Sequence, residues 1–378
     1  MEQTKGQGLT IAYDAKRAFL NYRGLGNYCR NVLMQLAQFY PDNHYLLCTP
    51  KDKNLYPLLY NEPFETILPH GAWKLFPALW RRTGIGSSLK NRSINIYHGL
   101  SQELPHDIDQ LHCKSVVTMH DAIFLRYPHL YSATYRYSFI KRNEYACRKA
   151  DLIFAISEQT KKDYIHFFGV PEEKIKVVYQ GCNDIYWQPV SEKQCAQVKL
   201  RFSLPDQYIL SVGALEERKN QIRLIKALAS AHIQIPLVLV GRGNGNYIQS
   251  LHQTAKQYNI DLRLITDATL NDLPALYSLA TVFAYPSLFE GFGIPILEAA
   301  RCQTPVVASK GICFEEIVGD GALYVDPLDI DELGSAIKNY IDSPDLRKVH
   351  TATALKNTER FKASQRAKDM MDAYLSLL

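Results

Sequence analysis

The sequence lacks an apolar run long enough to cross a membrane. A transmembrane helix needs about 20 consecutive apolar residues, and every apolar stretch here is interrupted well before that length. The segment Met1 to Gly8 leads directly into an apolar strand pattern and lacks the hydrophobic segment of a secretory signal. The composition, with 47% hydrophobic and 21% charged residues, is typical of a globular protein. We therefore expect a cytoplasmic protein.

Cysteine is present, but not in an arrangement that indicates a disulfide framework or a zinc site. The eight cysteines include no C-x-x-C pair. Several lie inside apolar strand or helix patterns, where a free thiol behaves as a small hydrophobic group. We expect buried, reduced thiols.

The chain also lacks a strong charge of either sign, since its net charge is +5. Residues 1–190 hold 23 Lys and Arg against 17 Asp and Glu, and the remaining residues hold 20 against 21. The modest basic excess of the first half indicates an anionic partner: nucleic acid, a phospholipid surface or a pyrophosphate-linked acceptor. No recognition motif accompanies the charge, so we expect no nucleic-acid partner.

The length of 378 residues indicates two domains, because one hydrophobic core rarely supports so long a chain. Both halves alternate short apolar runs with amphipathic stretches, which is the pattern of parallel sheets covered by helices. The predicted fold class is α/β, with two Rossmann-like, doubly wound domains facing across a cleft. We place these domains at 1–185 and 186–360, followed by a C-terminal helix at 361–378. Ligands of such sheets bind outside the carboxyl ends of the strands.

Apolar runs predict six strands in each half. In the first half they are Leu9–Asp14, Tyr45–Thr49, Ile94–His98, Ser115–His120, Leu152–Ser157 and Ile175–Tyr179. In the second half they are Tyr208–Val212, Pro236–Val240, Leu262–Thr266, Val282–Tyr285, Pro305–Ala308 and Ala322–Val325. Helical periodicity predicts helices at Asn27–Phe39, Ser132–Lys149 and Asp329–Ile341. In the last of these, Asp329 is expected to cap the helix and Glu332 to complete a capping box.

The most informative segment holds two carboxylates, Glu290 and Glu298, around a Gly-Phe-Gly turn. Gly291 and Gly293 allow backbone N–H groups to approach a ligand closely, and the start of the following helix favours negative charge. The carboxylates can accept hydrogen bonds from a polyol. A nucleotide sugar offers both a diphosphate and many hydroxyls, so this segment indicates glycosyl transfer.

Adjacent cations, Arg218 and Lys219, follow the strand that ends before Gly213. A diphosphate leaving group needs compensating charge, which Arg supplies as paired donors and Lys as a compact ammonium. The alternative for this stretch is a solvated helix start. A second glycine turn, at Val240–Gly243, is interpreted as an ordinary turn with an exposed Arg242.

Gly24 and Gly26 follow the first strand and open a helix, where backbone donors could meet a phosphate. The third glycine and the acidic residue of a dinucleotide fingerprint are missing, which argues against a dehydrogenase-type site. His120, followed by Asp121, ends another strand and is placed to touch a substrate. Its alternative is a core histidine bonded to backbone, and His98 is a weaker candidate.

Two D-x-D sequences could in principle hold a divalent ion on a diphosphate. Asp107–Asp109 lies in a polar loop, and Asp329–Asp331 is explained by helix capping, so we interpret both as chance and expect no metal and no cofactor. The aromatic and basic segment Trp73–Arg82 has two interpretations: an element resting on anionic lipid, or a helix packed in the core. Core packing is favoured because Pro77 interrupts any long amphipathic helix.

Taken together, these motifs resemble the retaining glycosyltransferases of family four, which have the two-domain GT-B fold. The resemblance spans nearly the whole chain. It is carried by Arg23-Gly-Leu-Gly-Asn-Tyr28, His120-Asp121, Gly213 with Arg218-Lys219, and Glu290-Gly-Phe-Gly-Ile-Pro-Ile-Leu-Glu298. Arg301-Cys-Gln303 departs from the family, in which a small residue and glycine are common there, and should alter packing rather than chemistry.

The resemblance implies a role for each matching residue. Glu298 would hold the ribose hydroxyls, while Glu290 and the backbone of Gly291, Phe292 and Gly293 would contact the donor sugar and its phosphates. Arg218 and Lys219 would stabilise the departing diphosphate. The Gly24–Gly26 loop would close on it from the other domain, and His120 would lie beside the sugar. The family's last helix crosses back to the first domain, and Ala363–Leu378 has a suitable apolar period.

The resemblance also implies transfer with retention, in which the leaving phosphate oxygen accepts the proton of the acceptor hydroxyl. Asp267 could read a guanine base or could cap the next helix, as aspartate often does at such turns. Overall likeness to bacterial mannosyltransferases favours GDP-mannose over UDP-sugars. The acceptor would be a growing surface glycan or a lipid-linked oligosaccharide, with an anionic membrane surface as a further partner. The alternatives are a UDP-sugar-dependent transferase, a phosphorylase or epimerase, and a non-catalytic subunit that binds nucleotide.

Overall fold

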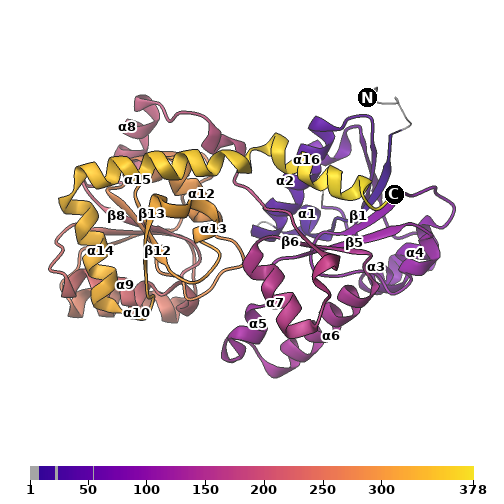
Figure 1. Cartoon of the computed structure of the whole chain (residues 1–378), viewed down its shortest axis with the longest axis horizontal. Helices are drawn as coiled ribbons and strands as arrows, with labels where there is room; N and C mark the ends of the chain where they lie inside the picture. Colours follow the sequence, from indigo (N-terminus) through magenta and orange to yellow (C-terminus); the bar gives the residue numbers. More distant parts are fainter. Residues whose placement is uncertain (1–7, 22–23, 54) are drawn as a thin grey trace. The chain divides into compact units, whose positions relative to one another are not determined.

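The computed structural model describes residues 8–21, 24–53 and 55–378 (Figure 1). One unit combines the residues up to Gln180 with Ala363–Leu378, and the other spans Gly181–Lys362. The sequence put the corresponding limits at 185 and 360. Each unit contains one parallel sheet covered by helices, which confirms the predicted α/β class. Within the described residues, no helix combines the length and the apolar character that a membrane span requires.

The first unit is built on a seven-stranded sheet of order β3-β2-β1-β4-β5-β6-β7, in which every neighbouring pair is parallel. Its strands are β1 (Thr10–Asp14), β2 (His44–Cys48), β3 (Phe64–Ile67), β4 (Ile96–Gly99), β5 (Lys114–Met119), β6 (Leu152–Ala155) and β7 (Ile175–Val177). The central strands are buried on both faces, which is why they read as continuous apolar runs. The sequence did not predict β3, a short edge strand that is mostly only half-buried.

Helices of the first unit are α1 (Lys16–Leu20), α2 (Gly24–Phe39), α3 (Pro77–Thr83), α4 (Ile85–Leu89), α5 (Ile123–Arg126), α6 (Ala133–Lys149), α7 (Glu158–Phe168) and α16 (Ala363–Leu375). Helix α2 packs against α1 and against α16, so the end of the chain completes the core of the first unit. Ser132 caps α6 by accepting a hydrogen bond from the Tyr135 N–H.

The second unit has a six-stranded parallel sheet of order β10-β9-β8-β11-β12-β13. Its strands are β8 (Ile209–Val212), β9 (Leu237–Val240), β10 (Leu262–Ile265), β11 (Val282–Tyr285), β12 (Val306–Ser309) and β13 (Ala322–Val325). All six were predicted. From β8 the chain adds strands β9 and β10 on one side, and from β11 it adds β12 and β13 on the other side. The boundary between β8 and β11 is therefore a switch point, and open α/β sheets bind ligands in the crevice at such a point.

Helices of the second unit are α8 (Glu192–Arg201), α9 (Gln221–Ser230), α10 (Gly245–Gln257), α11 (Leu273–Ser278), α12 (Ile294–Arg301), α13 (Glu315–Val318), α14 (Ile330–Asp342) and α15 (Pro344–Asn357). Asp329 caps α14 through the N–H groups of Asp331 and Glu332. The predicted capping box is wrong, because the Glu332 carboxylate accepts from the Asp326 N–H at 2.7 Å instead of reaching the cap residue.

Candidate functional site

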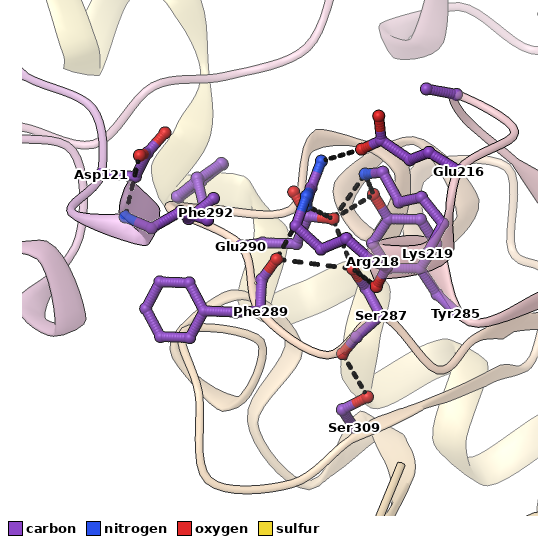
Figure 2. Close-up of polar contacts among 12 residues, drawn as sticks. Asp121, Glu216, Arg218, Lys219, Tyr285, Ser287, Phe289, Glu290, Phe292 and Ser309 are labelled. Carbon is purple, nitrogen blue, oxygen red and sulfur yellow. Dashed lines mark hydrogen bonds and ion pairs between the residues drawn. The ribbon is translucent and has the colours of Figure 1, made fainter. Parts of the chain in front are cut away.

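Two loops meet at the switch point of the second sheet. One follows β8 and carries Gly213, Arg218 and Lys219, and the other follows β11 and carries Ser287 and Glu290. Because β8 and β11 are hydrogen-bonded neighbours whose connections leave in opposite directions, their carboxyl ends bring these loops together. Figure 2 shows the Arg218 and Lys219 side chains converging on the Glu290 carboxylate.

The Glu290 carboxylate is the centre of a charged cluster. Its Oε1 atom forms an ion pair with the Lys219 ammonium and another with Arg218 Nη1 at 2.7 Å. The same oxygen accepts hydrogen bonds from the Ser287 hydroxyl at 2.6 Å and the Tyr285 hydroxyl at 3.2 Å. Lys219 Nζ also donates to the Tyr285 hydroxyl at 2.5 Å. The side chains of Lys219, Glu290 and Arg218 are only 10%, 14% and 16% exposed, so these interactions are poorly screened by water.

This environment moves the pKa values of the cluster. Burial alone would raise the pKa of Glu290, but Lys219 and Arg218 outweigh it and lower that pKa to about 2. Burial and the neighbouring Arg218 lower the pKa of Lys219, while Glu290 opposes them. Glu290 is therefore ionised near neutral pH, and two cations are already concentrated at one point of the sheet edge.

Hydrogen bonds to backbone carbonyls tie the two loops to each other and to the end of β12. The Leu288 N–H donates to the Arg218 carbonyl at 2.8 Å, and Arg218 Nη1 donates to the Phe289 carbonyl at 2.8 Å. Asn220 Nδ2 donates to the Pro286 carbonyl at 3.0 Å, and Ser309 Oγ donates to the Ser287 carbonyl at 2.7 Å. The cluster is thus held by a rigid frame, which is what preorganised charge stabilisation requires.

Glycine is required where the β8 and β9 loops touch. Gly213 and Gly241 have φ values of +148° and +155°. A Cβ on Gly241 would lie 1.8 Å from the Gly213 carbonyl oxygen, so no side chain fits there. A Cβ on Gly213 would face the Lys219 side chain at 3.6 Å. Gly241 therefore has a packing function that the sequence interpretation of an ordinary turn missed, while Arg242 is exposed as expected.

The Gly-Phe-Gly turn is fixed from beneath. Phe292 is buried and meets Phe361 edge-on at 5.7 Å, so its side chain belongs to the core of the second unit. The Cys313 thiol donates to the Phe292 carbonyl at 2.7 Å. Gly293 has φ +115°, and a Cβ there would lie 2.8 Å from the Phe314 ring. Of this turn, then, the backbone is what can reach a ligand.

Glu298 lies on the helix that follows the Gly-Phe-Gly turn, α12, in a different environment from Glu290. It accepts a hydrogen bond from the Tyr277 hydroxyl at 2.9 Å. Burial raises the pKa of Glu298 to about 7, although the Tyr277 and Tyr186 side chains act to lower it. The Arg301 departure noted in the sequence affects packing, because its guanidinium stacks 3.9 Å from the centre of the Trp187 ring and pairs with Glu359.

Comparison with known proteins identifies the family of this chain. Residues 193–357 match the family model for glycosyl transferases group 1, and residues 22–184 match the model for Glycosyltransferase Family 4. The O-antigen chain mannosyltransferase B of Escherichia coli is 30% identical over 296 residues, covering 76% of this chain and 76% of that protein. The chain belongs to the family-four glycosyltransferases.

Further similarities place this glycosyltransferase among proteins of the GT-B fold. The O-antigen chain mannosyltransferase RfbU of Salmonella typhimurium is 31% identical over 235 residues, covering 61% of each protein. The structure of Anabaena Alr3699/HepE in complex with UDP matches with a TM-score of 0.77 at 20% identity, covering 98% of this chain and 100% of that chain. WaaG, a glycosyltransferase involved in lipopolysaccharide biosynthesis, matches with a TM-score of 0.72 at 16% identity. The fold of this glycosyltransferase is therefore GT-B, as the resemblance implied.

Three predicted site residues of this glycosyltransferase belong to the first unit. His120 is buried, its Nε2 donates to the Leu100 carbonyl at 2.9 Å, and its ring meets Tyr28 edge-on at 4.7 Å. Burial lowers the pKa of His120 to about 4, so the ring is neutral near pH 7 with its proton on Nε2. The backbone bond is the feature expected of a core histidine, and the role of His120 beside the sugar stays a prediction.

Gly24 and Gly26 require a correction of detail. They do not form a loop, because both lie in the first turn of α2. A Cβ on Gly26 would lie 1.8 Å from the Asn21 carbonyl oxygen, whereas nothing lies within 4 Å of one on Gly24. The Gly26 position is thus fixed by packing at the start of the helix. The marker residue Arg23 lies outside the described residues.

The remaining predictions concern the base and the metal. Asp267 is exposed after β10, and its nearest cation is Arg201 at 3.4 Å. The residue that organises this turn is Asp272, which accepts from the Thr269 N–H at 2.8 Å.

In the described part of the chain, no three His, Cys, Asp or Glu side chains are grouped so as to hold a metal ion. Asp109 pairs with Lys149, and Asp107 accepts from the Ser87 N–H.

Sequence reasoning missed the uncharged members of the cluster. Tyr285 was noted only as the end of a predicted strand, and Ser287, Tyr277 and Asn220 were given no role. Tyr285 ends β11, while Tyr277 comes from α11, far from Glu298 in the sequence. The available signal was the position of Tyr285 and Ser287 at the carboxyl end of a strand next to the switch point.

Proposed function

We propose that this glycosyltransferase moves a mannosyl group from GDP-mannose to a hydroxyl of a growing surface glycan or lipid-linked acceptor, with retention of configuration and without a metal. The observation that carries the proposal is the buried Arg218–Lys219–Glu290 cluster at the switch point of the second sheet. It supplies two positive charges where a diphosphate leaving group would need them.

The geometry of Glu290 supports separate roles for its two oxygens. The contacts with Lys219, Arg218, Ser287 and Tyr285 all reach Oε1. Oε2 is then the atom that would accept a hydrogen bond from a hydroxyl of the donor sugar. Diphosphate binding would draw Arg218 and Lys219 partly away from Oε1, so that the cations follow the charge as it develops on the leaving group.

Retention by same-face attack agrees with the protonation states. A general base works best with a pKa near the working pH, but the pKa of Glu290 is lowered to about 2 because Lys219 and Arg218 outweigh the effect of burial. The lowered pKa of His120, about 4, makes that ring a weak base as well. Neither group assigned beside the sugar is suited to act as a base, and Glu298, with a pKa that burial raises to about 7, is assigned to the ribose hydroxyls. We therefore expect the proton of the acceptor hydroxyl to pass to the departing phosphate oxygen, whose negative charge Arg218 and Lys219 would stabilise.

Two relatives named as O-antigen chain mannosyltransferases support mannose as the sugar. The alternative is a UDP-sugar, which is favoured by the similarity to Anabaena Alr3699/HepE, solved in complex with UDP and with UDP-glucose. A thermal-shift panel of GDP, UDP, GDP-mannose and UDP-glucose separates the two. A ligand at a hundredfold excess over its Kd stabilises the folded state by about 2.7 kcal/mol. Stabilisation by the uridine nucleotides alone would contradict the GDP-mannose proposal.

Replacing Glu290 by Gln tests the assigned roles directly. The substitution removes the charge that competes with the diphosphate for Arg218 and Lys219, so we expect GDP to bind more tightly while kcat falls by roughly a hundredfold or more. Isothermal titration with GDP and initial rates with GDP-mannose measure the two effects. Glu216→Gln is the matched control. It also removes a carboxylate that pairs with Arg218, at 2.6 Å, but it leaves Glu290 in place.

Variant and wild type should show the same far-ultraviolet dichroism before their rates are compared, since an unpaired buried cation costs several kcal/mol.

Nuclear magnetic resonance of the product reports its anomeric configuration, and turnover after EDTA treatment tests the metal-free proposal. A β-linked product from GDP-α-mannose, or activity lost with EDTA and restored by Mn²⁺, would refute the corresponding part of the mechanism.

A further inference from the structure

The segment Trp73–Arg82, for which core packing was favoured, divides its side chains between the core and the surface. Trp80 is fully buried, donating its Nε1 proton to Ser88 Oγ at 2.8 Å, and Trp73 packs partly buried against the same core. Leu75, Phe76 and Leu79, by contrast, expose 77%, 60% and 49% of their surface. Pro77 starts α3 after the short helical turn Gly71–Leu75, and the two tryptophans take the inward positions on either side of it.

These exposed apolar side chains border an open groove of about 600 Å³. Its other walls include Lys16, Pro50 and Lys51. Apolar side chains gathered beside a groove mark an interaction site more often than apolar side chains scattered singly over a surface do. Leu75 and Phe76 therefore need an explanation that core packing does not give.

The charged residues that line the groove, Lys16, Lys51, Arg81 and Arg82, are all basic. Residues 68–83 contain Lys74, Arg81 and Arg82 and no Asp or Glu. Arg81 is turned inward by its ion pairs with Asp14 at 2.6 Å and with Glu103. Lys51, Lys74 and Arg82 are exposed and present positive charge beside the apolar side chains.

We propose that Lys51, Lys74, Leu75, Phe76, Leu79 and Arg82, here called the Phe76 patch, dock this protein on the surface of an anionic phospholipid bilayer. The apolar side chains enter the interfacial layer, and the cations meet the phosphate groups around them. A second copy of the chain fits less well, because a two-fold contact would place the patch against its own positive charge. Only the reason for docking rests on the proposed function: docking would bring the enzyme to a lipid-carried acceptor.

Vesicle co-sedimentation of the full chain tests the proposal without donor or acceptor. We expect binding to vesicles of phosphatidylcholine mixed with phosphatidylglycerol, little binding to phosphatidylcholine alone, and weaker binding as salt is raised. Lys74→Ala and Arg82→Ala should each weaken binding about fivefold, as expected for ~1 kcal/mol per cation. Leu75→Ser with Phe76→Ser should weaken it by roughly tenfold or more.

Leu200→Ser is the matched control, because Leu200 lies on α8 of the second unit and is 83% exposed. It removes an equally exposed apolar side chain and should leave vesicle binding unchanged. Equal binding to both vesicle types, binding to neither, or wild-type binding by the Phe76 patch variants would overturn the proposal. So would a dimer in analytical ultracentrifugation that Leu75→Ser with Phe76→Ser dissociates.

The thermal melt and the nucleotide thermal shift are measured on the same variants. Both should be unchanged, since the Phe76 patch makes no contact assigned to donor binding. If a serine variant unfolds, the exposed Lys74→Ala and Arg82→Ala variants still decide the question. Failure of vesicle binding with an intact nucleotide response would refute the docking surface alone and leave the proposed function standing.

Discussion

Glu290 and Glu298 carry the same side chain but hold their protons very differently. Both are largely buried, and burial by itself raises the pKa of a carboxyl group. The pKa of Glu290 nevertheless falls to about 2, because Lys219 and Arg218 outweigh burial, whereas burial raises the pKa of Glu298 to about 7, against the tyrosines that act to lower it. The motif therefore contains one permanently charged carboxylate and one that titrates near neutrality.

The raised pKa of Glu298 predicts a specific dependence of stability on pH. The folded protein binds this proton more tightly than the unfolded chain, so the stabilisation is complete below pH 4.5 and is lost as pH rises to about 7. The loss amounts to about 3 kcal/mol at ~1.4 kcal/mol per pH unit. In Glu298→Gln this part of the dependence should vanish, which urea unfolding at several pH values between 4.5 and 8 would measure. An unchanged slope would contradict the raised pKa.

At the scale of single residues, the sequence predicted the charged groups better than their partners. Arg218, Lys219 and Glu290 were each assigned to the donor site, from two separate motifs, and the structure brings them together. The hydroxyl of Tyr285 was not predicted, because a tyrosine in an apolar strand looks the same whether it faces the core or a charged cluster. The contact between Tyr277 and Glu298 joins different helices, and no local pattern records it.

At the scale of the element, the site depends on how closely two strand ends approach. Gly241 after β9 and Gly213 after β8 touch through their backbones, and the Gly213 N–H donates to the Val240 carbonyl at 2.9 Å. This contact positions the loop that carries Arg218 and Lys219. The second glycine turn, which the sequence interpreted as ordinary, is therefore part of the frame of the site.

We expect Gly241→Ala to destabilise the protein by about 2 kcal/mol or more, because its Cβ would lie 1.8 Å from a carbonyl oxygen and its φ is +155°. Gly245, at the start of α10, is the matched control. Nothing lies within 4 Å of a Cβ placed there, so Gly245→Ala should be neutral or stabilising by up to ~1 kcal/mol. Thermal unfolding of the two variants provides the comparison. Equal melting temperatures would show that the backbone contact is unimportant.

Element boundaries followed the local signals where those signals were strong. Asp329 caps its helix as predicted, and Ser132, where a helix was predicted to begin, is the cap of α6. Edge strand β3 escaped prediction because it is short and half-buried, so neither a continuous apolar run nor a clear alternation marks it. The Glu332 side chain was assigned to a capping box, but Lys310 and the Asp326 N–H compete for it across the fold.

At the scale of the whole molecule, the C-terminal helix belongs to the first unit. Helix α16 packs on α2, and its Tyr374 hydroxyl lies 2.6 Å from His98 Nδ1 and 3.3 Å from the Tyr13 hydroxyl. His98 Nε2 in turn lies 2.8 Å from Thr118 Oγ1, so a buried chain of polar groups joins α16 to β1, β4 and β5. Burial lowers the pKa of His98 to about 3, which keeps the ring neutral inside this chain.

Tyr374→Phe tests whether the last helix is an integral part of the first unit. The substitution removes the hydroxyl that satisfies a buried His98 nitrogen, and an unsatisfied buried polar group costs about 1–3 kcal/mol. We expect that loss in denaturant unfolding, with an unchanged nucleotide thermal shift. Tyr137→Phe is the control, because Tyr137 is 67% exposed. A destabilisation of the same size in both variants would contradict the structural role.

The sequence by itself determined the two α/β units, nearly all of their strands and the identity of the charged residues, because apolar runs, glycine turns and helix caps act over a few neighbouring residues. Only the tertiary structure decided the strand order, the partners of Glu290 and Glu298, the close contact of Gly213 with Gly241 and the exposure of Leu75 and Phe76. These features depend on burial and on groups distant in the sequence. A local pattern can indicate that a side chain is buried, but it does not say which distant groups surround that side chain and set its electrostatic environment.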